Sequence, residues 1–180
     1  SSEEEEEYVE SSVESLYNDA MDLMIQQRLK PAAVMFGEVE RQHPYSVWAT
    51  KAQLMAAYAY YQASDYDDAL NALDRFISLH PGNRDVAYAY FLRALSYYEQ
   101  ISDVKRDQMM TELALDAFEE VVRRFPNSKY ARDAHIKIDL TFDHLAGKEM
   151  DIGRYYLRSG EYLAAINRFR TVVEDYQETT

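Results

Sequence analysis

The sequence predicts an all-α protein, a right-handed solenoid of helical hairpins with about four repeats. The main evidence is a sequence motif that occurs four times and is called the repeated phrase below. In it, a small residue is followed at +4 and +7 by large apolar residues. The four copies are Ala32, Phe36 and Val39; Ala69, Leu73 and Phe76; Ala114, Phe118 and Val121; and Ala165, Phe169 and Val172. These spacings put all three residues on one face of a helix, and a phrase repeated in this way is typical of stacked helical repeats.

A proline at +12 closes three of the four copies, as Pro44, Pro81 and Pro126, and Gln177 stands at the fourth position. Proline cannot extend a helix, and it pushes the residue before it towards an extended conformation. Each copy is therefore predicted to be the second helix of a hairpin. Pro31 is expected in the first turn of such a helix, where its missing N–H is harmless.

Residues 1–11 are predicted to be an acidic flexible lead. Seven acids and no base lie in the first fourteen residues, and a run of like charges this dense stays solvated. Three hairpins follow, and Ser12 and Asp67 are expected to act as N-caps within them. The helices expected in these hairpins are 12–27 and 31–42, 46–64 and 67–79, and 84–101 and 109–124.

The later repeats are longer than a plain tetratricopeptide unit of about 34 residues, because the anchor alanines are separated by 37, 45 and 51 residues. In the third repeat the excess is a polar insertion at 102–108. Before the fourth phrase, residues 128–159 are predicted to form one unusually long helix, bent near Gly147. Gly147 and Gly153 are expected to weaken that helix by about 1 kcal/mol each.

The expected tetratricopeptide solenoid covers residues 12–180, and its repeats are expected at about 12–45, 46–82, 83–127 and 128–180. Gly160 turns the chain into a last helix, 161–176. This helix carries an apolar stripe that consists of Ile166, Phe169, Val172 and Val173. Because a solenoid normally closes with a helix whose outer face is polar, we expect that the chain is a fragment or that a partner covers this end.

The composition excludes several classes of function. The chain has 180 residues, a formal net charge of −13 and 47% hydrophobic residues, which suffices for a sizeable core. Nucleic-acid binding depends on neutralising phosphates, so this acidic chain is expected to have no nucleic-acid partner. It has no cysteine, and no apolar run approaches the roughly 18 residues needed to cross a bilayer.

No group of residues converges on catalysis, so the protein is predicted not to be an enzyme and to have no cofactor or metal site. Its five glycines form no phosphate-binding pattern. His135, Asp139 and Asp143 share a helix face, but a row that rises about 6 Å per step is unlike three close zinc ligands. His43 and His80 precede helix-ending prolines at equivalent places, so their rings are expected to pack there.

Several phrases are more specific than the repeat itself. They are His43-Pro44-Tyr45-Ser46, His80-Pro81-Gly82-Asn83, Phe125-Pro126-Asn127-Ser128-Lys129-Tyr130-Ala131, Ala57-Tyr58-Ala59-Tyr60-Tyr61, Asp74-Arg75-Phe76-Ile77, Tyr90-Phe91-Leu92-Arg93, Lys105-Arg106-Asp107 and Tyr155-Tyr156-Leu157-Arg158-Ser159-Gly160. In these phrases, in the insertion and in the overlong fourth unit, the chain resembles the BamD family over roughly residues 12–180. These proteins are tetratricopeptide lipoproteins of the bacterial outer-membrane β-barrel assembly machine. The family's N-terminal lipidated cysteine is absent here, and four of its usual five repeats are present.

The resemblance implies a scaffold at the periplasmic face of the outer membrane, anchored in its full-length form by a lipid that this chain does not carry. Its C-terminal repeats would hold the last POTRA domain of the barrel subunit BamA. Its N-terminal repeats would receive unfolded outer-membrane proteins or another assembly lipoprotein. The alternative is a general periplasmic tetratricopeptide adaptor in cell-envelope coordination. Adaptors with a carboxylate clamp are disfavoured, because tyrosine and methionine stand where such a clamp needs basic residues.

Two sets of candidate site residues follow. The first helices of tetratricopeptide hairpins line the concave side, and soft methionine suits a groove that accepts different peptides. The candidate substrate groove consists of Tyr17, Met21, Met24, Leu54, Tyr58 and Tyr61; the alternative is that the methionines are core residues. The POTRA-facing candidates are Arg168, Arg154 and Arg158, because the resemblance places the barrel subunit at these repeats and an arginine can fork onto a carboxylate. The alternative for Arg168 is a solvated arginine.

Overall fold

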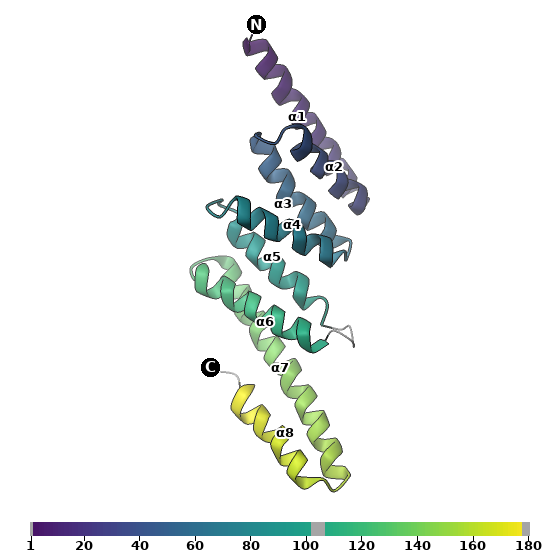
Figure 1. Cartoon of the computed structure of the whole chain (residues 1–180), viewed down its shortest axis with the longest axis vertical. Helices are drawn as coiled ribbons and strands as arrows, with labels where there is room; N and C mark the ends of the chain where they lie inside the picture. Colours follow the sequence, from purple (N-terminus) through teal and green to yellow (C-terminus); the bar gives the residue numbers. More distant parts are fainter. Residues whose placement is uncertain (1, 102–106, 178–180) are drawn as a thin grey trace. The chain divides into compact units, whose positions relative to one another are not determined.

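The computed structural model describes residues 2–101 and 107–177, and every regular element in these ranges is an α-helix (Figure 1). The helices are α1 (Ser2–Ile25), α2 (Leu29–Gln42), α3 (Val47–Gln62), α4 (Tyr66–Leu79), α5 (Val86–Tyr98), α6 (Asp107–Arg124), α7 (Lys129–Arg158) and α8 (Tyr162–Asp175). The prediction of an all-α protein made of helical hairpins is confirmed. Most of the predicted polar insertion, 102–106, lies outside the described residues.

The chain forms two compact units, Ser1–Ala117 and Phe118–Thr180, with the boundary inside α6. In the first unit, each helix from α1 to α4 packs against the helix that follows it. In the second unit, α7 packs against α8. The predicted limits of the four repeats stay a prediction.

The first helix begins earlier than expected. α1 starts at Ser2, so the predicted start at Ser12 is wrong, and Ser12 is an interior helix residue rather than an N-cap. Glutamate has a good helix propensity, and Glu3, Glu4 and Glu5 lie in the first turn, where the helix dipole favours negative charge. The backbone of the acidic lead is therefore part of α1.

Three hairpins share one kind of turn between their two helices. In each turn one residue has a left-handed backbone conformation: Gln27 with φ 60°, Ser64 with φ 59° and Gly160 with φ 75°. The N–H of this residue donates to the carbonyl three residues earlier, and the next N–H donates to the carbonyl five residues earlier. These two hydrogen bonds form a Schellman motif, which closes the first helix of each hairpin.

The residue after each of these turns precedes the second helix of its hairpin. Arg28, Asp65 and Glu161 hold this position with φ between −91° and −89° and ψ of 71° or 72°, and none of their side chains makes a capping hydrogen bond. The prediction that Asp67 is an N-cap is therefore wrong, because Asp65 holds that place and Asp67 lies in the first turn of α4. The three hairpins thus have the same backbone but different side chains at this point.

The phrase of a ring residue followed by proline forms a second kind of turn. The N–H of His43, His80 and Phe125 donates to the carbonyl four residues earlier, which closes the preceding helix. The residue three positions later donates back to the carbonyl of the ring residue, with proline in the second position of the turn. That later residue also accepts a hydrogen bond from the start of the next helix: Ser46 from Trp48, Asn83 from Asp85 and Ser128 from Ala131.

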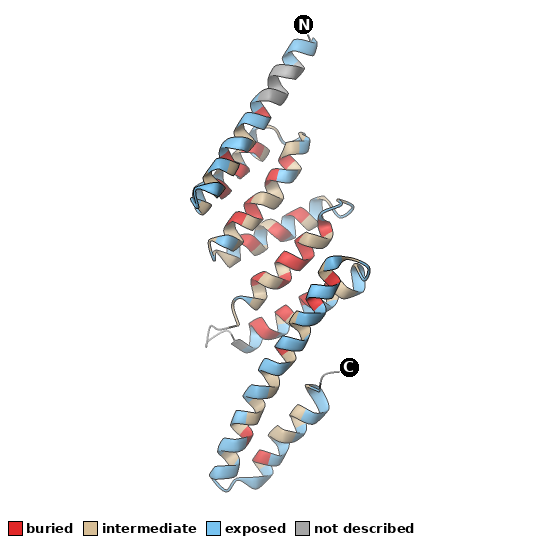
Figure 2. Ribbon diagram, turned by 180° about the vertical axis from the view of Figure 1, so that it is seen from behind, coloured by how far each residue is buried: buried red, intermediate tan, exposed pale blue. Residues whose placement is uncertain are grey.

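The anchor residues of the first three repeated phrases form core positions. All nine expose at most 1% of their surface, and Figure 2 shows more buried residues along α2 to α5 than on α7 and α8. Full burial of one large apolar side chain contributes about 1.5–3 kcal/mol, so these positions account for the repetition in the sequence. The ring of His80 lies 5.3 Å from that of Phe76, and its Nε2 lies 3.1 Å from Gln53 Oε1. The expected packing of this histidine at a helix end is confirmed.

In the second unit, α7 is a single helix of 30 residues, as predicted. Its Gly153 is buried beneath the ring of Phe169 on α8. A Cβ added at Gly153 would lie 2.5 Å from Phe169 Cε1, whereas a Cβ at Gly147 would meet nothing within 4 Å. Gly153 therefore leaves room for the ring of Phe169, whereas Gly147 faces open space.

The fourth repeated phrase, on α8, is less well covered than the other three. Ala165 is buried, but Phe169 and Val172 are half-buried. Ile166 and Val173 expose 51% and 60% of their surface. The predicted uncovered stripe is thus confirmed at these last two residues.

Candidate protein-binding surfaces

The first helices of the hairpins lie next to one another in the first unit. α1 contacts α3 and α3 contacts α5, in addition to the contacts between helices that are consecutive in the chain. Long side chains join the second helices: Glu40 on α2 pairs with Arg75 on α4, and Lys30 Nζ lies 3.9 Å from Asp65 Oδ2. We call α1, α3 and α5 the inner row, because their backbones approach one another more closely than those of α2 and α4.

Three of the candidate groove residues lie on α1 and contact one core cluster. Tyr17, Met21 and Met24 are half-buried against a cluster that includes Phe36 of α2. The ring of Tyr17 lies 5.4 Å from that of Phe36 and 4.9 Å from that of Trp48 on α3. Each of these three side chains therefore packs against the core with one part and exposes the rest to solvent. Trp48 was missed in the sequence, although it is the chain's single tryptophan.

The other three candidates lie on α3 and contact a second cluster. Leu54, Tyr58 and Tyr61 are half-buried against residues of α3, α4 and α5. The Tyr61 hydroxyl donates to Glu99 Oε1 at 3.3 Å, at the C-terminal end of α5. Burial, with the negative charge of Glu99 second, raises the pKa of Tyr61 to about 12. The six candidates thus form two groups of three, and Glu99 belongs with the second group.

The candidate arginines lie on α7 and α8. Arg168 Nη1 donates to both carboxylate oxygens of Glu149 at 3.1 Å, which joins the two helices. This hydrogen bond raises the pKa of Arg168. Arg154 Nη1 donates to Asp151 Oδ1 at 3.1 Å, and Arg158 is exposed. Arg168 is thus partly exposed and paired within the chain, and sequence analysis missed Glu149 as its partner.

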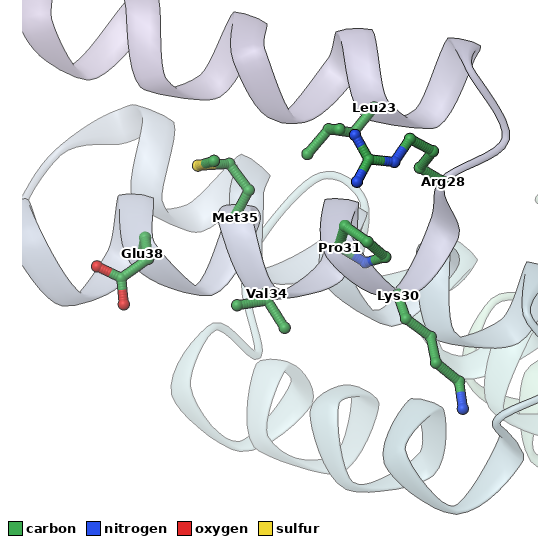
Figure 3. Close-up of a pocket in the computed structure, with 7 residues that line it drawn as sticks. All are labelled: Leu23, Arg28, Lys30, Pro31, Val34, Met35 and Glu38. Atoms are coloured by element: carbon green, nitrogen blue, oxygen red, sulfur yellow. The ribbon is translucent and has the colours of Figure 1, made fainter.

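The first hairpin also carries a pocket of about 600 Å³ that sequence analysis missed (Figure 3). Figure 3 shows Leu23 and Arg28 on one side of α2 and Lys30 and Val34 on the other, with Pro31 between them. Met35 and Glu38 complete its lining. The floor is apolar, and two basic side chains stand at the end where α2 begins.

Neither a metal site nor a membrane span emerges from the described part of the chain. Among the described side chains, which leave out those of residues 6–11 and 107, no three histidine, aspartate or glutamate side chains are grouped so that they could hold a metal ion. His135, Asp139 and Asp143 are all exposed on α7. No helix within residues 2–101 and 107–177 has both the length and the hydropathy needed to cross a bilayer.

The helical hairpins and their side-chain surfaces define a repeat protein of the tetratricopeptide type. Two solved structures share its fold. The structure titled "MamA RS-1 ArsTM double mutant" matches with a TM-score of 0.54 and 18% sequence identity, over 90% of this chain and 74% of that chain. The crystal structure of MamA matches with a TM-score of 0.52 and 18% identity, over 86% of this chain and 92% of that chain.

The chain belongs to the family described as outer membrane lipoprotein, YfiO, whose pattern matches residues 9–180. It is 51% identical to the outer membrane protein assembly factor BamD of Caulobacter vibrioides, over 96% of this chain and 57% of the relative. It is 50% identical to BamD of Rickettsia prowazekii, over 93% of this chain and 66% of the relative. The expected resemblance to BamD proteins is confirmed, and the chain spans less than two thirds of the length of these two relatives.

Proposed function

We propose that this chain is a non-catalytic scaffold of an outer-membrane protein assembly complex. It acts at the periplasmic face of the outer membrane, where a lipid anchors the full-length protein. The name shared by the relatives, outer membrane protein assembly factor, supports the general role. The observation that carries the proposal is the inner row, where neighbouring hairpins present half-buried tyrosine and methionine side chains side by side.

The inner row of the first unit binds unfolded outer-membrane proteins or segments of other assembly lipoproteins. Tyr17, Met21 and Met24 on α1, and Leu54, Tyr58 and Tyr61 on α3, supply the contact. Methionine adapts its shape to different apolar side chains, and tyrosine offers a ring together with a hydroxyl group. The Tyr58 hydroxyl accepts a hydrogen bond from Gln62, and the Tyr61 hydroxyl donates one to Glu99. These hydrogen bonds hold the two rings in place.

The second unit binds the POTRA domain of a BamA-like barrel subunit through Arg168, with Arg154 and Arg158 beside it in the predicted site. The Arg168 side chain is 41% exposed, while its partner Glu149 is 18% exposed. Glu149 therefore fixes the direction of the guanidinium and leaves part of it accessible to a carboxylate of the partner. A scaffold with both sites raises the concentration of clients near the barrel subunit.

Charge reversal at Arg168 tests the proposed POTRA contact. The affinity of the chain for the isolated POTRA region is measured by calorimetry, and Arg168→Glu is expected to weaken it at least tenfold, because a charge-assisted pair is lost and a repulsion is introduced. Arg170→Glu changes the net charge equally at an exposed neighbour and serves as the matched control. Equal affinities of Arg168→Glu and the unchanged chain would remove Arg168 from the site.

A further inference from the structure

The pocket on the first hairpin is separate from the proposed client surface. Leu23, which lines the pocket, and Met21, which belongs to the candidate groove, are about 200° apart around α1 at about 100° per residue. The pocket residues of α2 lie on its exposed face, whereas its core residues Phe36 and Val39 lie on the opposite face. A ligand in the pocket would therefore lie mainly along α2, and none of the six candidate groove residues lines the pocket.

The second hairpin shows that the repeat fold does not require this pocket. Its backbone before α4 has φ −91° and ψ 71°, against −90° and 72° before α2. At the position of Arg28 it has Asp65, at that of Lys30 it has Asp67, and at that of Val34 it has Asn71. The same geometry thus accepts acidic and polar residues, although the first hairpin has basic and apolar ones there. Val34 is 62% exposed, so core packing does not account for it.

The charges of the pocket favour an anion at the end where α2 begins. Glu38, at the far end, accepts hydrogen bonds from Arg41 Nε and Nη2 at 2.7–3.0 Å, which offset its charge. Lys30 lies 3.9 Å from Asp65, so its charge is partly offset as well. Arg28 makes no ion pair within 4.0 Å among the described residues. A positive charge therefore remains beside an apolar floor, on a chain whose formal net charge is −13.

We propose that this pocket binds an extended segment of a partner protein in which an acidic side chain is followed two residues later by a large apolar side chain. The carboxylate pairs with Arg28, and the apolar side chain lies over Val34 and Met35. Side chains two residues apart in an extended chain point to the same face and are about 7 Å apart. The pocket extends along α2 from Pro31 to Glu38, about 10 Å, which matches about three extended residues.

The test uses the peptide acetyl-Gly-Ser-Asp-Ser-Phe-Ser-Gly-amide, which has no free terminal carboxylate. It is titrated into the labelled protein, and the amide NMR signals are followed. We expect the shifts to concentrate at residues 28–38. Arg28→Asp and Val34→Asn place the residues of the second hairpin in the first, and both positions are exposed, so both variants should fold. We expect Arg28→Asp to weaken binding about tenfold and Val34→Asn about fivefold.

Two controls separate this site from general attraction. Arg84→Asp makes the same charge change at a residue with an 84% exposed side chain and should leave the affinity unchanged. A peptide with asparagine in place of its aspartate should bind about tenfold more weakly. Shifts at Tyr17, Tyr58 and Tyr61 in place of residues 28–38, an unchanged affinity of Arg28→Asp, equal binding of both peptides, or no binding would each overturn the proposal. The POTRA measurement does not depend on this outcome.

Discussion

The two interior glycines of α7 provide a matched pair of substitutions in one helix. Replacing glycine with alanine in a helix interior contributes about 1 kcal/mol of stability when the methyl group has room. At Gly147 nothing lies within 4 Å of the added Cβ, so the full gain is expected there. At Gly153 the Cβ would lie 2.5, 2.8 and 3.0 Å from Cε1, Cδ1 and Cζ of Phe169, and the first two distances are shorter than real Cβ contacts.

The cost of this overlap decides the sign of the effect at Gly153. Forcing an extra methyl group into a packed contact costs about 1–3 kcal/mol, because the ring or the backbone must shift. Against a gain of about 1 kcal/mol, Gly153→Ala is expected to be neutral or to destabilise the chain by up to about 2 kcal/mol. The two variants should therefore differ by about 1–3 kcal/mol, with Gly147→Ala the more stable.

Thermal unfolding followed by far-ultraviolet circular dichroism measures this difference. For a chain of this size, 1 kcal/mol shifts Tm by about 2–4 °C, so Gly147→Ala should melt about 2–4 °C above the unchanged chain. In a Phe169→Leu background the penalty of Gly153→Ala should shrink, because the two residues are in contact. If Gly153→Ala were as stabilising as Gly147→Ala, the described packing of α7 on α8 would be refuted.

Three further predictions concern the turns and the inner row. Gln27→Gly and Ser64→Gly should each stabilise the chain by about 1 kcal/mol in thermal unfolding, because glycine adopts a left-handed conformation without strain; a lower Tm would argue against the shared turn. Ser46→Ala should cost about 1 kcal/mol because it removes the cap of α3, and an unaltered Tm would contradict that cap. Tyr61 should titrate near pH 12 by tyrosinate absorbance, and Glu99→Gln should lower its pKa. The pKa of Tyr61 is higher in the folded chain than in the unfolded chain. The stability that this tyrosine contributes should therefore be complete below pH 10 and be lost from pH 10 to 12. A Tyr61 that titrates at pH 10 would exclude the described environment.

The helix order could be predicted from the sequence because the repeated phrase and its proline fix both the buried face and the end of each second helix. The predicted ends at Gln42, Leu79 and Arg124 are those of α2, α4 and α6. The start of α1 could not be predicted from charge alone, because repulsion between glutamates competes with their helix propensity and with the helix dipole. Here the helical tendency prevails from Ser2 onward.

The sites were less predictable than the fold, because they depend on contacts between residues far apart in the chain. Arg168 stands out as a charge beside an apolar stripe, but its partner Glu149 is 19 residues away on another helix. Gln27 and Ser64 have a left-handed backbone although neither is a glycine, so the sequence at these positions does not indicate the turn. The turn can be recognised there only because these residues are equivalent to Gly160 in the last hairpin. The pocket of the first hairpin has no sequence motif. It depends on basic and apolar residues of the first hairpin at positions where the second hairpin has acidic and polar residues.

Site-specific photocrosslinking shows whether the inner row receives unfolded outer-membrane proteins. A photoreactive amino acid replaces Met24 or Tyr58 on the inner row, or Asn71 on the exposed face of α4, and each variant is irradiated with a urea-denatured outer-membrane barrel protein diluted into buffer. We expect strong adducts at Met24 and Tyr58 and weak ones at Asn71. Equal yields at all three positions, or adducts at Asn71 alone, would contradict this expectation.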